Sequence, residues 1–154
     1  MCMVLVLNGP NLNLLGTREP ELYGTASLDE IRATLSDRAA RENIALSFEQ
    51  YNDERQMIAK LHQAPAENTS FLLLNPAAYT HSSIALRDAL AAVRIPFVEV
   101  HLSNVYRREP FRRKSLFADL AVGVVAGFGK LSYSLAFEAA LDYLRHRPNL
   151  LPGA

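Results

Sequence analysis

Three groups of polar side chains in this chain are of the types used in acid–base chemistry, and each follows a short apolar segment. They are Asn11, Arg18 and Tyr23, then Asn75 and His81, and finally Glu99 and His101. A free tyrosine releases its proton near pH ~10, but a guanidinium within a few ångström stabilises the phenolate, so Tyr23 beside Arg18 could act as a general base. The alternative is an ordinary loop in which Arg18 is solvated and the Tyr23 ring packs on the protein.

Glu99 and His101 are two residues apart in a segment expected to be extended, so both side chains point to one side. A carboxylate in that position selects the tautomer of the imidazole, which suits acid–base catalysis. A structural histidine satisfied by a neighbouring glutamate has the same pattern. A basic run at 107–114 follows; it is either a solvated face or the source of one arginine that holds a substrate carboxylate in a bidentate fork.

Asn75 ends an apolar run, which places its amide as donor and acceptor near the edge of a sheet. His81 lies just before an expected helix start, where free backbone N–H groups favour an anion such as a carboxylate. Ordinary capping by Ser82 or Ser83 explains the serines. It does not explain a polar asparagine after four apolar residues.

Short apolar segments that alternate with amphipathic helical patterns must position these side chains. Residues 3–7 are apolar without alternation, which is typical of a strand covered on both faces, and we interpret them as the first, central strand. Further strands are expected at 44–51, 71–74, 97–100 and 120–125, and helices from a capping box at Ser27 to about 42, at 54–64, from 82 or 83 to 93, and at 131–145. This alternation predicts an α/β fold, a flavodoxin-like doubly wound five-stranded parallel sheet with helices on both faces.

Open α/β sheets bind ligands beyond the carboxyl ends of their strands. The three polar groups follow the first, third and fourth expected strands, which should be neighbours, so their coincidence favours one site. The loop at 11–25 is long for a βα connection, whose usual length is about 2 to 6 residues, and this suggests a functional loop or lid.

Composition limits the remaining classes of protein. The 154 residues, 49% hydrophobic, suit one catalytic domain over 1–154 with a loose tail from about 147. With 16 basic and 16 acidic residues, the chain lacks the positive field of most nucleic-acid binders. The single cysteine, Cys2, excludes an internal disulfide. Because no signal core or apolar run of roughly 20 residues is present, we expect a cytoplasmic protein outside the membrane.

Two other classes of function are compatible with an α/β fold of this size. A flavodoxin-like binding or signalling domain would need a phosphate loop rich in glycine or hydroxyls after the first strand, or clustered acids, and residues 8–11 offer neither. A metal hydrolase could use His81, His101 and Glu99, but the chain has no helical His-x-x-x-His pair and no cysteine ligands.

Taken together, the motifs resemble those of the type II 3-dehydroquinate dehydratases (type II dehydroquinases) from about Met3 to Leu144. The motifs that carry the resemblance are 7–16, 18–20 with 23–24, 75–76 with 80–81, 86–89, 99–104 and 108–112. The resemblance implies dehydration of 3-dehydroquinate to 3-dehydroshikimate in the shikimate pathway, for aromatic amino-acid biosynthesis or quinate catabolism. It implies anti elimination through an enolate without metal or cofactor.

The resemblance also implies roles for individual residues. Tyr23 matches the base, Arg18 its activator on a mobile lid, and Asn11 a residue that orients the water supporting the enolate. His101, paired with Glu99, matches the acid that protonates the departing hydroxyl. Substrate-holding positions are matched by Asn75, His81 and Arg112, by backbone groups at Leu102 and Ser103, and by Asp88 from a neighbouring subunit. The implied assembly is a homododecamer, a tetramer of trimers.

Several positions depart from the family pattern. Ala77 stands where glycine is usual, so a positive φ there would add roughly 1 kcal/mol or more of strain. Tyr51, Asp53 and Arg55 replace other residues in a segment that keeps Asn52 and Glu54, and Ser132 and Ser134 replace small or glycine-like positions before the last helix. We expect these changes to affect assembly or substrate affinity rather than the chemistry.

Overall fold

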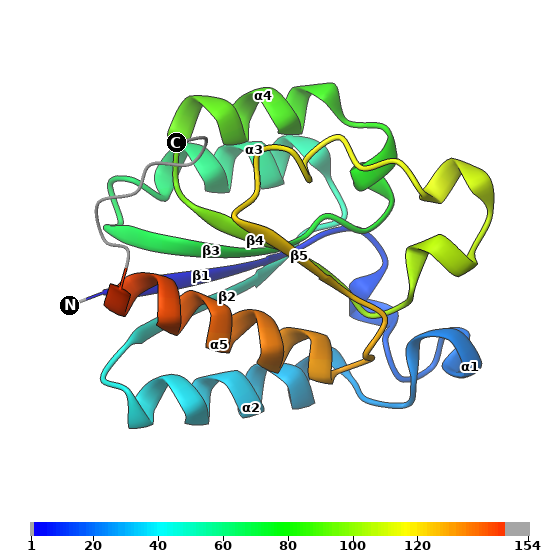
Figure 1. Ribbon diagram of the computed structural model, residues 1–154, viewed down its shortest axis with the longest axis horizontal. Coiled ribbons are helices and arrows are strands. Elements are labelled where there is room, and N and C mark those ends of the chain that lie inside the picture. The colour runs from blue at the N-terminus through cyan, green and yellow to red at the C-terminus, as the bar shows by residue number, and fades with distance from the viewer. Residues whose placement is uncertain (1, 147–154) are drawn as a thin grey trace.

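The computed structural model describes residues 2–146, which form a five-stranded parallel sheet between two layers of helices (Figure 1). The strands are β1 (Met3–Asn8), β2 (Ala45–Gln50), β3 (Thr69–Asn75), β4 (Phe97–His101) and β5 (Gly123–Ala126). The helices are α1 (Pro20–Tyr23), α2 (Leu28–Arg41), α3 (Glu54–Gln63), α4 (Ile84–Val93) and α5 (Leu131–His146), with short 3₁₀ turns η1 (Leu12–Leu14), η2 (Ala77–His81), η3 (Val105–Arg107) and η4 (Pro110–Arg112). The strand order β2-β1-β3-β4-β5 confirms the predicted flavodoxin-like fold.

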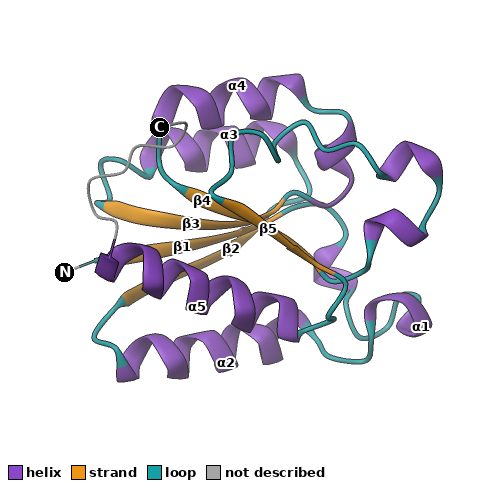
Figure 2. Cartoon of the chain, in the orientation of Figure 1, coloured by secondary structure: helices purple, strands orange, loops and turns teal. Residues whose placement is uncertain are grey.

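Helices α2 and α5 cover one face of the sheet, and α3 and α4 cover the other (Figure 2). Alternate residues of β1 enter the two cores: Val4 and Val6 pack with α2 and α5, whereas Leu5 and Leu7 pack with α3 and α4. All four are fully buried. The unbroken apolar run in β1 therefore follows from burial on both faces of the sheet.

Two strand predictions are corrected by the structure. β1 is an interior strand, but the middle position belongs to β3, because β1 pairs with β2 on one side and β3 on the other. β5 begins at Gly123 rather than at 120, because the chain first turns at Phe117, whose carbonyl accepts the N–H groups of Leu120 and Ala121. The other predicted strands and helices are confirmed with small shifts at their ends, and the predicted tail from about 147 lies outside the described residues.

Side-chain caps place the helices that border the site. Ser27 caps α2 by accepting the N–H of Glu30 at 3.2 Å, and Ser83, rather than Ser82, caps α4. Ser132 lies inside α5 and not before it; its hydroxyl accepts the N–H of Phe128 at 3.1 Å. Over residues 2–146, no helix is both long and apolar enough to cross a membrane.

The turns after β1 and β3 approach each other closely at Gly9. A Cβ added to Gly9 would lie 2.5 Å from the carbonyl oxygen of Pro76, and the Gly9 N–H donates to the carbonyl of Asn75 at 2.8 Å. Only glycine fits there without moving the backbone. This contact brings the first and second polar groups to the same end of the sheet.

Candidate active site

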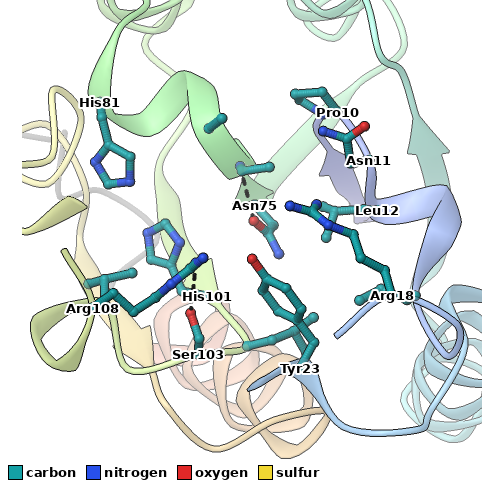
Figure 3. Close-up of a pocket in the computed structure, with 15 residues that line it drawn as sticks. Pro10, Asn11, Leu12, Arg18, Tyr23, Asn75, His81, His101, Ser103 and Arg108 are labelled. Atoms are coloured by element: carbon teal, nitrogen blue, oxygen red, sulfur yellow. Dashed lines mark hydrogen bonds between the residues drawn. The ribbon is translucent and has the colours of Figure 1, made fainter. Parts of the chain in front are cut away.

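A pocket opens at the carboxyl ends of β1, β3 and β4, and it brings together all three polar groups (Figure 3). Its lining residues are Pro10, Asn11, Leu12, Leu15, Arg18, Tyr23, Asn75, Ala77, Ala78, His81, His101, Leu102, Ser103, Val105 and Arg108. The position agrees with the rule that open α/β sheets bind ligands beyond the carboxyl ends of their strands.

Three predicted site residues do not line this pocket. Glu99 is buried behind His101, Asp88 lies exposed on α4, and Arg112 pairs with Glu109 at 2.7 Å between Nε and Oε2. Arg112 is still close enough for its charge to act on His81.

Arg108 takes a place in the pocket wall that sequence reasoning did not assign to it. Its side chain is only 12% exposed, and Nη1 lies 3.5 Å from the hydroxyl of Ser103. The signal was the basic run at 107–114, but the 3₁₀ turns η3 and η4 determine which arginine of that run turns inward.

Tyr23 lies at the end of α1, on the long loop after β1. The guanidinium carbons of Arg18 and Arg108 lie 5.5 and 5.3 Å from the centroid of its ring. The hydroxyl end of the ring points into the pocket towards Asn75 (Figure 3). Two cations therefore stand beside the aromatic ring, at distances typical of cation–π contacts.

Glu99 and His101 form a buried pair on β4, because alternate residues of a strand point to the same side. Nε2 of His101 lies 2.6 Å from Oε1 of Glu99, and the two residues are 6% and 1% exposed. A carboxylate only accepts, so the proton on this contact belongs to Nε2. Nδ1 is then the ring nitrogen that can serve a bound molecule.

His81 reaches the pocket from η2. Its Nδ1 lies 2.8 Å from the carbonyl oxygen of Lys114, so Nδ1 carries the hydrogen and donates it. Burial lowers the pKa of His81, which favours the neutral ring with Nε2 as an acceptor. Within residues 2–146, no three side chains of His, Cys, Asp or Glu are grouped in a way that could hold a metal ion.

The amide of Asn75 is held by a buried hydrogen-bonded chain. Its Nδ2 donates to the Tyr133 hydroxyl at 2.8 Å, which donates in turn to Oδ1 of Asn8 at 2.7 Å. Its Oδ1 accepts the N–H of Ala77 at 3.1 Å. Tyr133 comes from α5, 58 residues further along the chain than Asn75, and the sequence analysis did not single it out. Burial raises the pKa of Tyr133, which keeps the phenol protonated and able to donate.

Asn11 has a left-handed backbone, with φ of 68°, and its N–H donates to Oδ1 of Asn52 at 3.0 Å. Gln50 supports the same contact, because its Nε2 donates to Oδ1 of Asn52 at 2.9 Å. The segment after β2 thus holds the loop that carries Asn11. Within that segment, Asp53 caps α3 by accepting the N–H of Arg55 at 2.7 Å.

Ala77 has φ of 51°, so the left-handed conformation considered for this position from the sequence is present. An L residue with a Cβ loses about 1–2 kcal/mol in this region relative to the right-handed one. The strain lies in the wall of the pocket, because Ala77 lines it. Ala77 is also the residue whose N–H donates to Oδ1 of Asn75.

Comparison with known proteins finds relatives over nearly the whole chain. A sequence model of the family described as Dehydroquinase class II matches residues 2–141. A 3-dehydroquinate dehydratase of Laribacter hongkongensis is 58% identical over 144 residues, which are 94% of this chain and 93% of the relative. One of Ectopseudomonas mendocina is 56% identical over 147 residues, 96% of this chain and 99% of the relative. The crystal structure of a type II dehydroquinase from Butyrivibrio crossotus superposes with a TM-score of 0.87 at 39% identity, covering 90% of this chain and 96% of that one.

Proposed function

We propose, since the chain belongs to the class II dehydroquinase family of enzymes, that it removes water from 3-dehydroquinate to give 3-dehydroshikimate. The relatives at 58% and 56% identity are named for this activity. The observation that carries the proposal is the shared pocket: Tyr23, Asn75 and His101 line it together, and the hydroxyl end of the Tyr23 ring points into it (Figure 3). The reaction belongs to the shikimate pathway, in aromatic amino-acid biosynthesis or quinate catabolism.

In the first step, Tyr23 as phenolate takes the proton from the carbon next to the substrate ketone. The C–H electron pair moves towards the carbonyl oxygen, and an enolate forms. Arg18 and Arg108, beside the Tyr23 ring, stabilise the phenolate that this step consumes. A positioned base of this kind contributes about 10²- to 10⁴-fold in rate.

The enolate needs hydrogen-bond donors that are in place before its charge develops. We assign this role to a water molecule oriented by Asn11. Asn75, His81, Arg112 and the backbone at Leu102 and Ser103 hold the substrate in the pocket, and Asp88 reaches it from a neighbouring subunit.

In the second step, the enolate re-forms the ketone as the new C=C bond forms and the C–O bond to the departing hydroxyl breaks. His101, as imidazolium, transfers the proton on Nδ1 to that hydroxyl, which leaves as water. Glu99 stabilises the imidazolium through Nε2. We propose that the elimination is anti, with Tyr23 and His101 acting on opposite faces of the bound substrate. Exchange with solvent then removes the proton from Tyr23 and returns one to His101.

The test is the ultraviolet absorbance rise of the conjugated enone product when the purified protein meets 3-dehydroquinate, with and without a chelator. We expect turnover that persists after chelation and falls at least about 10²-fold in Tyr23→Phe. Arg18→Ala should lower kcat far more than it raises KM, whereas Arg112→Ala should weaken binding as well.

Tyr106→Phe is the matched control, since Tyr106 is 63% exposed and lies outside the pocket. Wild-type turnover in Tyr23→Phe would refute the base assignment. A folded protein that leaves 3-dehydroquinate unchanged would favour a binding module instead.

We further propose a single catalytic domain over residues 1–154, located in the cytoplasm, that assembles as a homododecamer, a tetramer of trimers. Asp88 is exposed on α4, where a neighbouring subunit could receive it. Light scattering is expected to give the mass of the dodecamer, and a dominant trimer or monomer would contradict this assembly.

A further inference from the structure

Ser115 lies between η4 and β5, next to the buried pair on β4. Its hydroxyl donates to Oε2 of Glu99 at 2.7 Å and accepts the N–H groups of Phe117 and Ala118, each at 3.0 Å. A serine hydroxyl has one hydrogen and two lone pairs. Since both lone pairs receive backbone N–H groups, the hydrogen is directed to Glu99.

The second oxygen of Glu99 is thereby satisfied. Oε1 accepts from His101 and Oε2 accepts from Ser115, while the Glu99 side chain is 2% exposed. A buried carboxylate is stable as an anion only when its oxygens are hydrogen-bonded and a cation or donor stands beside it.

We propose that Ser115 is a positioning residue for the acid of the reaction: its hydroxyl holds the Glu99 carboxylate turned towards Nε2 of His101, which leaves the His101 proton on Nδ1 for the departing hydroxyl. This inference rests on the proposed dehydration. The acid then consists of three hydrogen-bonded residues, His101, Glu99 and Ser115, rather than two. Ser115 does not line the substrate pocket.

The segment that carries Ser115 is itself firmly held. Arg87 of α4 donates to the carbonyl of Leu116 at 2.6 Å and forms a two-point ion pair with Asp119, at 2.5 and 2.8 Å. The carbonyl of Lys114, directly before Ser115, accepts from His81 at 2.8 Å. The segment at 114–115 therefore contacts His81 directly and His101 through Glu99. Arg87, which belongs to the motif at 86–89, holds this segment in place.

Other charged or titratable groups lie in or beside the pocket that His101 lines, and a pH profile must be read against them. They are His81 on η2, Arg108 and Arg112 on the segment after β4, and Arg18 and Tyr23 on the loop after β1. None of these side chains is bonded to the Ser115 hydroxyl itself. A difference between the profiles of the variant and the unsubstituted enzyme therefore reports on the Glu99–His101 pair.

The experiment compares Ser115→Ala, Ser115→Cys and Ser115→Thr with the unsubstituted enzyme by the product absorbance. By analogy with the partners that orient metal-ligating histidines, whose loss lowers activity about 10- to 100-fold, kcat of Ser115→Ala should fall by that factor while KM changes little. The carboxylate loses a donor, so the pair retains its proton to higher pH, and the alkaline limb of the kcat profile moves upward. Ser115→Thr keeps the hydroxyl and should restore most of kcat.

Ser27→Ala is the matched structural control, because it also removes a hydroxyl that accepts a backbone N–H, without contact to Glu99. A wild-type kcat and pH profile in Ser115→Ala, or a loss that Ser115→Thr shares, would overturn the proposal. If Ser115→Ala fails to fold, Ser115→Cys decides, since its weak donor should give an intermediate kcat at unchanged KM, and wild-type values would refute the role. Failure of the proposed dehydration itself is distinct: the unsubstituted enzyme would then be inactive.

Discussion

Tyr133→Phe removes one oxygen from the buried chain that orients Asn75. The hydroxyl accepts from Asn75 at 2.8 Å and donates to Asn8 at 2.7 Å. Asn8, Asn75 and Tyr133 are 0%, 3% and 0% exposed. The substitution therefore leaves one buried donor and one buried acceptor without their partner, in a place that bulk water does not reach.

The expected loss follows from those two groups. A buried polar group left without its partner destabilises the folded state by about 1–3 kcal/mol, so two groups give about 2–6 kcal/mol. Phenylalanine keeps the ring and its packing, and small shifts of the two amides recover part of the loss. We expect the free energy of unfolding to fall by ~2–4 kcal/mol, a large part of the usual ~5–15 kcal/mol of a domain.

Urea unfolding measures this loss, at one fixed protein concentration because assembly would otherwise change the apparent stability. The midpoint should fall with an unchanged m-value, and KM for 3-dehydroquinate should rise because the Asn75 amide is free to turn. Tyr106→Phe, on an exposed tyrosine, controls for the loss of a hydroxyl alone. A fall below ~0.5 kcal/mol with unchanged KM would refute the reasoning that the hydroxyl bridges the two amides.

Two further substitutions in the pocket wall test strain and charge. Ala77→Gly relieves about 1–2 kcal/mol of backbone strain and loses about 0.5–1 kcal/mol to the freedom of glycine in the unfolded chain, so a small rise in Tm is expected and a fall would contradict it. Burial lowers the pKa of His81, so the unfolded chain binds more protons as pH falls through its usual value of 6.5, and stability declines there. His81→Gln should weaken this decline in unfolding measured against pH; an unchanged slope would show that other groups cause it.

The fold was predictable because its signals are local. The unbroken apolar run of β1 reports burial on both faces, and Ser27 marks the start of α2 by a cap that involves only the next turn. Strands that alternate with helices in this way allow few connections, since crossovers between parallel strands are right-handed. Polar residues directly after three of these strands then had to share one edge of the sheet.

The sequence was least informative where the backbone leaves regular structure. Arg108 and Arg112 are nearly equivalent in the sequence, and only the turns η3 and η4 direct Arg108 into the pocket wall and Arg112 towards Glu109. The start of β5 depended on a turn at Phe117 that no periodic pattern records.

The acid–base side chains of the pocket are recognisable from local sequence, whereas the side chains that orient them come from distant parts of the sequence. Asn75 and His101 end strands and Tyr23 lies on the loop after β1, where residue type and position already indicate acid–base groups. The partners that orient them lie far along the chain: Tyr133 is 58 residues from Asn75, and Ser115 is 16 residues from Glu99. Those distant partners fix the Asn75 amide and the Glu99 carboxylate in one orientation. A sequence motif can therefore indicate the acid–base groups, while the orientation of Asn75 and Glu99 follows only from the folded chain.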